Sequence, residues 1–123
     1  MENLIAIVDY NQIQSLGRTA EVLDLAPLAE KWRAFRWAVR EIDGHDHAQI
    51  HAALTAVPFE PGRPSVLIAH TVKGKWVSFM EDRLAWHYKS PDDAQLAQAL
   101  AYLVLSRSPE HSEGAVEGLE GVA

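Results

Sequence analysis

The chain has 123 residues, a formal net charge of −6 and no cysteine. This length limits it to one domain, the acidic balance argues against nucleic acid as a main partner, and the lack of cysteine excludes a disulfide framework and a thiol nucleophile. The N-terminus has no basic targeting region, and its apolar run over residues 4–8 is too short to cross a membrane. We therefore expect a cytoplasmic protein that contacts neither membranes nor nucleic acid.

The first third of the chain predicts a strand, a loop and a helix. Residues 4–8 are continuously apolar, which predicts a parallel strand covered on both faces. Residues 12–24 have the composition of a loop. A helix begins at Pro27, with Asp24 upstream as a cap residue. At helical spacing, its buried face consists of Leu28, Trp32 and Phe35.

The middle of the chain continues the alternation of strands and helices. Residues 37–42 and 65–69 predict two further strands, and a helix over 46–56 and a proline-rich connection lie between them. Alternating strands and helices imply right-handed crossovers between parallel strands. We therefore expect the α/β class, with a parallel sheet and flanking helices.

The last part of the chain predicts an irregular segment, a helix and a tail. Residues 71–89 lack a periodic pattern, and long irregular segments in compact domains are usually functional. Ser90-Pro91 marks the start of a helix, since serine caps helices and proline fits the first turn. We expect the domain to cover 1–105 and a disordered acidic tail to cover 106–123, where few large apolar residues occur.

Three polar segments occupy positions where a ligand could bind. Asp9-Tyr10-Asn11 ends the first strand, His70-Thr71-Val72-Lys73-Gly74-Lys75 follows the third, and Ala85-Trp86-His87 lies further on. In open α/β sheets, ligands bind beyond the carboxyl ends of the strands. In this order, the three segments resemble the second half of the thiamine-diphosphate domain of transketolases. The resemblance covers about residues 3–105 and implies a partial domain of that type.

The resemblance implies roles for four residues. It assigns the Asn11 side chain and the Ile13 carbonyl to the magnesium ion that holds the cofactor diphosphate, and magnesium prefers such oxygen ligands. Val72, in the loop after the third strand, becomes a further cofactor contact. His87 lies over the diphosphate in this resemblance, where it binds the cofactor and polarises the donor substrate. His87 is therefore the catalytic candidate.

Structural explanations compete with the functional ones at several positions. Asn11 could simply end its strand by turning the backbone, and His70 could be a partly buried histidine at a strand end. His47 and His51 lie one helical turn apart and could share a zinc ion. A turn at Asp43-Gly44 followed by a helix start is the better account of that segment, and the resemblance includes a very similar turn without zinc.

The sequence departs from the family pattern in two ways. Trp76 stands where the family loop has a second glycine, which implies an altered loop or a smaller site. No Gly-Asp-Gly motif occurs in the chain, although the family uses its aspartate to bind magnesium, and the family's pyrimidine-binding domain is missing as well. One amide and one carbonyl cannot hold a magnesium diphosphate tightly, so we expect the chain to be inactive alone.

These features lead to the hypothesis of a split transketolase-like enzyme. The chain contributes the second half of the diphosphate-binding domain, and partner subunits supply the Gly-Asp-Gly half and the pyrimidine domain. The implied assembly is a hetero-oligomer with two-fold symmetry that uses thiamine diphosphate and Mg2+. The implied reaction transfers a two-carbon ketol unit from a ketose donor to an aldehyde acceptor. The alternative is a catalytically inactive interaction or regulatory module that has kept the fold.

Overall fold

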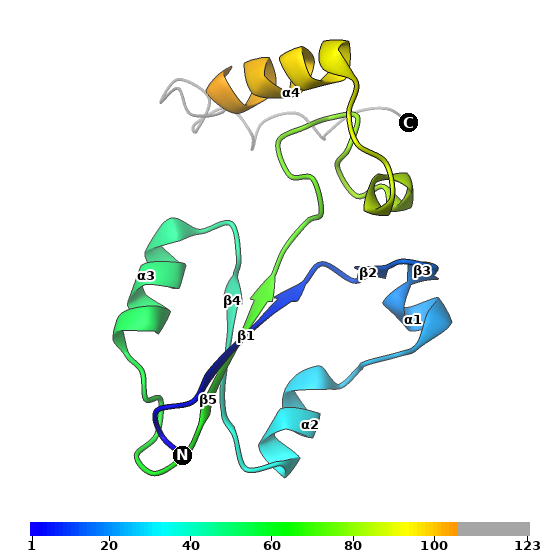
Figure 1. Ribbon diagram of the computed structural model, residues 1–123. Helices are drawn as coiled ribbons and strands as arrows, with labels where there is room; N and C mark the ends of the chain where they lie inside the picture. The colour runs from blue at the N-terminus through cyan, green and yellow to red at the C-terminus, as the bar shows by residue number, and fades with distance from the viewer. Residues whose placement is uncertain (106–123) are drawn as a thin grey trace, which may run out of the picture. The chain divides into compact units, whose positions relative to one another are not determined.

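The computed structural model describes residues 1–105 and divides the chain into two compact units (Figure 1). Unit 1 is Met1–Lys73, and unit 2 begins at Gly74. The acidic tail that we expect over 106–123 lies outside the described residues. Within the part of the chain that is described, no helix has both the length and the apolar character needed to cross a membrane.

Unit 1 is built on a parallel sheet of three strands. The order is β1 (Ile5–Tyr10), β5 (Ser65–His70) and β4 (Ala38–Asp43), so β5 lies in the centre. Both neighbours run parallel to β5, and Figure 1 shows the three strands crossing the middle of the unit. Residues 65–69 are all buried, as expected for a central strand in a continuous apolar run. The predicted parallel sheet with flanking helices is confirmed.

The helix α2 (Leu28–Ala34) covers one face of this sheet. Its Ala29 forms a buried core with Val66 and Ile68, and partly buried side chains of β1 and β4 pack around them. Trp32 of α2 meets Trp37 edge to face, with ring centroids 4.9 Å apart. Such a pair adds roughly 0.5–1.5 kcal/mol beyond its buried area.

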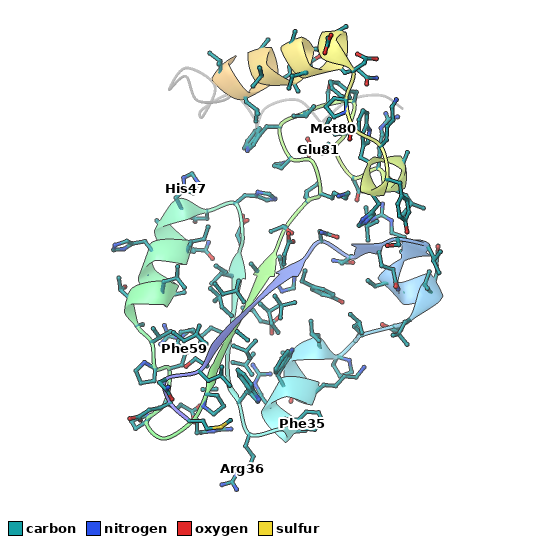
Figure 2. The ribbon with its side chains drawn as sticks, in the orientation of Figure 1. Phe35, Arg36, His47, Phe59, Met80 and Glu81 are labelled. Atoms are coloured by element: carbon teal, nitrogen blue, oxygen red, sulfur yellow. The ribbon has the colours of Figure 1, made fainter. Side chains whose placement is uncertain are left out.

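Two sequence predictions for this helix are wrong. Phe35 is 78% exposed instead of buried, because the helix ends at Ala34 and the chain turns at Arg36, whose φ is 67°. Figure 2 shows Phe35 and Arg36 at this end of unit 1. Asp24 does not cap the helix, since its Oδ1 accepts the amide of Ala26 at 2.9 Å. The turn brings Trp37 to the place beside Trp32 that helical spacing predicted for Phe35.

The predicted coverage of the first strand on both faces is also wrong. Side chains of β1 alternate between half-buried and exposed, and Ile5 and Ile7 are 44% and 60% exposed. The cause is topological: β1 is an edge strand, and α3 (His47–Thr55) packs near β4 at the opposite edge. The sheet therefore has an open edge flanked by exposed apolar side chains.

Residues 12–24 are more ordered than a plain loop. They form a two-stranded antiparallel hairpin, β2 (Ile13–Gln14) and β3 (Gly17–Arg18), followed by the short helix α1 (Thr19–Val22). The amide of Thr19 donates to the carbonyl of Gln12 at 2.9 Å and closes the hairpin. This hairpin fixes the chain directly after the end of β1.

Unit 2 contains the short 3-10 helix η1 (Leu84–His87) and the helix α4 (Asp93–Leu105). The predicted helix start is displaced by two residues, because Asp92 is the cap in place of Ser90. Asp92 Oδ1 accepts the amide of Gln95 at 2.8 Å, and Gln95 Oε1 accepts the amide of Asp92 at 3.1 Å. This reciprocal capping box satisfies two backbone donors at once, which a lone serine cap does not.

Candidate functional site

In unit 1, the chain segments that follow β1, β4 and β5 meet at the carboxyl ends of these strands. In the sheet register, His70 of β5 pairs with Tyr10 of β1 on one side and with Asp43 of β4 on the other. The residues that follow each strand are therefore neighbours, although they come from distant parts of the sequence. Open parallel sheets generally bind ligands at the carboxyl ends of their strands.

Asn11 and Ile13 form a tight turn after β1. The amide of Ile13 donates to Asn11 Oδ1 at 2.9 Å, and Gln12 between them has a φ of 62°. The Asn11 amide nitrogen lies 3.5 Å from Asp9 Oδ1 on the other side. These contacts assign the oxygen and nitrogen of the Asn11 amide and fix the direction of its oxygen. Asn11 therefore turns the backbone, as one of its two interpretations predicted.

The turn does not exclude the second interpretation, because an amide oxygen has two lone pairs. Ile13 pairs with Arg18 of β3, and its amide hydrogen is taken by Asn11. In an antiparallel ladder, such a residue directs both its N–H and its C=O away from the partner strand. The Ile13 carbonyl thus faces away from β3. One turn holds both oxygens that the sequence nominated as metal ligands.

These two oxygens alone would not complete a metal site. Among residues 1–105, no three His, Cys, Asp or Glu side chains are grouped so that they could hold a metal ion. Asn11 and Ile13 contribute neutral oxygens, and magnesium generally requires carboxylate or phosphate oxygens in addition. The donor set fits a magnesium ion that also receives ligands from elsewhere.

Asp9 lies in a segment that the sequence pointed to, but the sequence assigned it no role of its own. Its Oδ1 accepts the hydroxyl of Thr71 and lies near the Asn11 amide nitrogen. The carboxylate thus joins the ends of β1 and β5 and holds the orientation of Asn11. The available signal was its position two residues before Asn11, as the first charged side chain after the apolar run.

The turn after β4 packs closely against the end of β5. The Gly44 amide donates to the His70 carbonyl at 2.8 Å. A Cβ at Gly44 would lie 2.4 Å from Cγ2 of Thr71 and 3.0 Å from Cβ of Ala69, so a side chain cannot fit there. The next residue, His45, accepts the Val72 amide on its Nε2 at 2.7 Å. Gly44 and His45 together fasten this turn to the loop after β5.

Asp46 completes the turn as the cap of α3. Its Oδ1 accepts the amides of Ala48 and Gln49 at 2.8 and 3.1 Å, and its Oδ2 accepts the Gln49 side chain at 2.9 Å. These bonds, led by the Gln49 backbone amide, lower the pKa of Asp46 from its ordinary value of 3.8. The turn and helix start thus account for His45 and Asp46. His47, labelled in Figure 2, and His51 lie exposed on α3.

His70 lies at the end of β5 and is 45% exposed at its side chain. Its Nε2 is 2.9 Å from Glu41 Oε2, and its ring contacts the ring of Tyr10 with centroids 5.6 Å apart. Both contacts are with neighbouring strands of the sheet. His70 is therefore a strand-end histidine that links the three strands, and it is less buried than the structural explanation assumed.

In unit 2, the loop that begins at Gly74 is closed on itself. Gly74 has a φ of 71°, and a Cβ there would lie 2.8 Å from the Met80 Cβ. Lys75 Nζ lies 3.1 Å from Glu81 Oε1; Met80 and Glu81 are labelled in Figure 2. Trp76 is 55% exposed and also has a φ of 71°. The loop thus keeps a glycine-type backbone conformation at the position where tryptophan replaces the family glycine.

His87 lies in η1 and is half-buried. Its Nε2 is buried and has no hydrogen-bond partner within the described residues. The neighbouring Trp86 is fixed, since its Nε1 donates to the Phe79 carbonyl at 2.8 Å and Lys89 lies over its ring. A buried ring nitrogen without a hydrogen-bond partner lowers the stability of the folded protein. It is the kind of atom that a bound ligand satisfies.

Comparisons with known proteins agree with the sequence motifs. Residues 1–106 match the family described as "Transketolase, thiamine diphosphate binding domain". The chain is 41% identical over 103 residues to the 6-deoxy-6-sulfo-D-fructose transketolase subunit SqwG of Clostridium sp.. This alignment covers 84% of the present chain and 38% of that subunit. It is also 37% identical over 100 residues to an apulose-4-phosphate transketolase subunit of Phocaeicola vulgatus. That alignment covers 81% of the present chain and 36% of the relative.

A solved structure has the same fold. The crystal structure of transketolase from Campylobacter jejuni matches with a TM-score of 0.74 and 24% sequence identity, over 81% of this chain and 16% of that chain. The chain thus spans little more than a third of the two relatives named above and less than a fifth of this transketolase. The chain belongs to the transketolase family, and its residues 1–106 correspond to part of the thiamine diphosphate-binding domain.

Proposed function

We propose that the chain supplies one part of a thiamine diphosphate and magnesium site in a transketolase assembled from several parts. The observation that carries this proposal is the Asn11–Ile13 turn, which holds an amide oxygen and directs a carbonyl away from β3 at the carboxyl end of β1. Because both ligands are neutral, the remaining charge on magnesium is balanced by the cofactor diphosphate and by a carboxylate outside this chain. When bound, thiamine diphosphate supplies the electron sink for ketol transfer.

In this proposal, His87 binds the cofactor and polarises the donor sugar. Its unpartnered Nε2 supports the role, because a histidine ring nitrogen can hydrogen-bond to a phosphate or to an oxygen that gains negative charge. Val72 is a further proposed cofactor contact, through its carbonyl or side chain, because its amide already donates to His45.

The open edge of β1 is the proposed contact for the missing part of the domain. An edge strand with exposed apolar neighbours is a liability in water, and a further parallel strand would satisfy its backbone groups. Ile5 and Ile7 face away from the core that α2 covers, and they would be covered by the same partner. The partner then carries the Gly-Asp-Gly half, and a pyrimidine domain completes a hetero-oligomer with two-fold symmetry.

The proposed reaction is transfer of a two-carbon ketol unit from a ketose to an aldehyde. It is supported by the names of the two relatives, which belong to a 6-deoxy-6-sulfo-D-fructose transketolase and to an apulose-4-phosphate transketolase. Both names describe a sugar with an anionic group. We therefore propose an anionic ketose as the donor.

The decisive experiment is reconstitution with the partner, followed by titration of magnesium at saturating thiamine diphosphate. Asn11→Ala should raise the magnesium concentration needed for half-maximal activity by about tenfold, the effect of losing one charge-assisted contact. Asn11→Asp keeps the oxygen in place and should retain magnesium binding. Gln14→Ala, a change on the neighbouring strand, is the matched control. Unchanged magnesium dependence in Asn11→Ala would refute the metal assignment, and a partner complex without thiamine diphosphate would favour the inactive module.

A further inference from the structure

His45 makes a contact whose chemistry assigns the state of its ring. The Val72 amide donates to His45 Nε2 at 2.7 Å, across 27 positions in the sequence. A nitrogen that accepts this hydrogen bond cannot itself carry a proton, so the ring is neutral with its proton on Nδ1. A ring with hydrogen on Nε2 would place two N–H groups against each other.

The turn that carries the His45 ring is held by backbone hydrogen bonds of His45 and of the residue before it. The His45 amide donates to Asp43 Oδ1 at 2.8 Å, which closes the turn that carries the ring. The preceding Gly44 donates to the His70 carbonyl and leaves no room for a Cβ against Thr71. The His45 side chain therefore reaches Val72 from a rigid turn. A longer or looser turn would not fix the distance between the two atoms.

The loop that His45 holds is the one that leads from β5 to Gly74. Its first residue, Thr71, is already bonded to Asp9, and Val72 is the next residue along. These two hydrogen bonds restrict the backbone of the loop directly after β5. Without the bond to His45, the Val72 amide would be a half-buried donor with no backbone partner of its own, since the β5–β4 register ends at His70.

We propose that His45, in its neutral Nδ1-protonated form, is a positioning residue for the cofactor site. It fixes the Val72 backbone and thereby the Thr71–Lys73 segment, and it does not touch the cofactor. Its importance for cofactor binding rests on the proposed function, whereas its hold on the loop does not. The two claims can be measured separately.

The first measurement uses nitrogen NMR of the full chain at neutral pH. The His45 ring should show an unprotonated Nε2 and a protonated Nδ1. In His45→Phe, which keeps a ring without an acceptor, the Val72 amide should exchange with solvent about tenfold faster, corresponding to the loss of one hydrogen bond. His45→Gln places an oxygen near the position of Nε2 and should restore protection. His51→Phe, an exposed histidine on α3, is the control and should leave Val72 unchanged.

The second measurement is thiamine diphosphate affinity of the reconstituted complex. His45→Phe should raise the dissociation constant about tenfold, and His45→Gln should restore it. A proton on Nε2, or equal Val72 exchange in His45→Phe, would overturn the proposal. Faster exchange with unchanged cofactor affinity would overturn the positioning role. If the wild-type complex binds no cofactor, the proposed function fails, and the NMR measurement alone decides whether His45 holds the loop.

Discussion

The hydroxyl of Thr71 donates to Asp9 Oδ1 and joins the ends of two neighbouring strands across 62 positions of the sequence. The same carboxylate lies near the Asn11 amide nitrogen. One side chain therefore connects the exit of β5 with the turn that carries the proposed metal ligands. Its two contacts can be separated by mutation.

We predict that Asp9 and Thr71 are energetically coupled. Asp9→Ala and Thr71→Val should each lower the free energy of unfolding, and the double mutant should lose less than the sum, with a coupling energy of about 0.5–1.5 kcal/mol. Thr71→Ser keeps the hydroxyl and is the control. Urea unfolding of the four proteins followed by circular dichroism gives the cycle. Strict additivity would mean that the bond contributes nothing to stability.

Trp76 stores backbone strain that glycine should remove. A non-glycine residue in the left-handed region is unfavourable by roughly 1–2 kcal/mol, and Trp76 has a φ of 71°. Replacement also loses the contact of Lys75 Nζ with the Trp76 ring, at 4.9 Å from its centroid, which is worth about 0.5–1 kcal/mol at an exposed site. We expect Trp76→Gly to be more stable than Trp76→Ala by about 1 kcal/mol. Both variants lose the ring, so the difference between their free energies of urea unfolding reports the contribution of the backbone conformation.

The cap of α3 should make the stability of unit 1 depend on acid pH. Since hydrogen bonds from Gln49 and Ala48 lower the pKa of Asp46, the carboxylate form is favoured in the folded state. Its contribution to stability is fully present above the ordinary value of 3.8 and is lost as the pH falls through the lower folded pKa. In Asp46→Asn the cap oxygen no longer titrates. The variant's melting temperature should therefore fall less steeply below pH 4 than that of the wild type, and equal slopes would contradict the assignment.

Ile7 should matter for association more than for folding. The side chain is 60% exposed on the edge strand, so Ile7→Lys should change the unfolding free energy by less than about 1 kcal/mol. In the proposed complex, the lysine would be placed against the partner and should abolish co-purification. Leu16→Lys, at 78% exposure in the turn of the β2–β3 hairpin, is the matched control. Retained association in Ile7→Lys would exclude this face as the interface.

The strands β1 and β5 could be predicted from the sequence because each contains a continuous apolar run. Their exposure could not, since coverage depends on where a strand lies in the sheet: residues 65–69 are buried in the centre, whereas Ile5 and Ile7 are exposed at an edge. Helical spacing placed Phe35 in the core, but the helix ends one residue earlier and Trp37 is used instead. Local periodicity does not report where a helix stops.

The candidate site shows the same division between local and distant relationships. The resemblance could nominate Asn11 and Ile13 from sequence because both lie within one short motif, and a local turn joins them. The bonds from Thr71 to Asp9 and from Val72 to His45 join residues 62 and 27 positions apart, and no spacing rule predicts such pairs. Both depend on the strand order, which only the structure supplies. The unpartnered nitrogen of His87 is likewise visible only after folding.

The central position of β5 also determines when unit 1 can assemble during synthesis. β1 and β4 each pair with β5 and not with each other, and Ile5 must wait for Ser65. At about 5–20 residues per second, a ribosome needs roughly 3–12 s to add the intervening chain. During that interval, the nascent β1 has no strand of unit 1 to pair with. Translation speed through this region therefore sets how long the nascent segment stays vulnerable to aggregation.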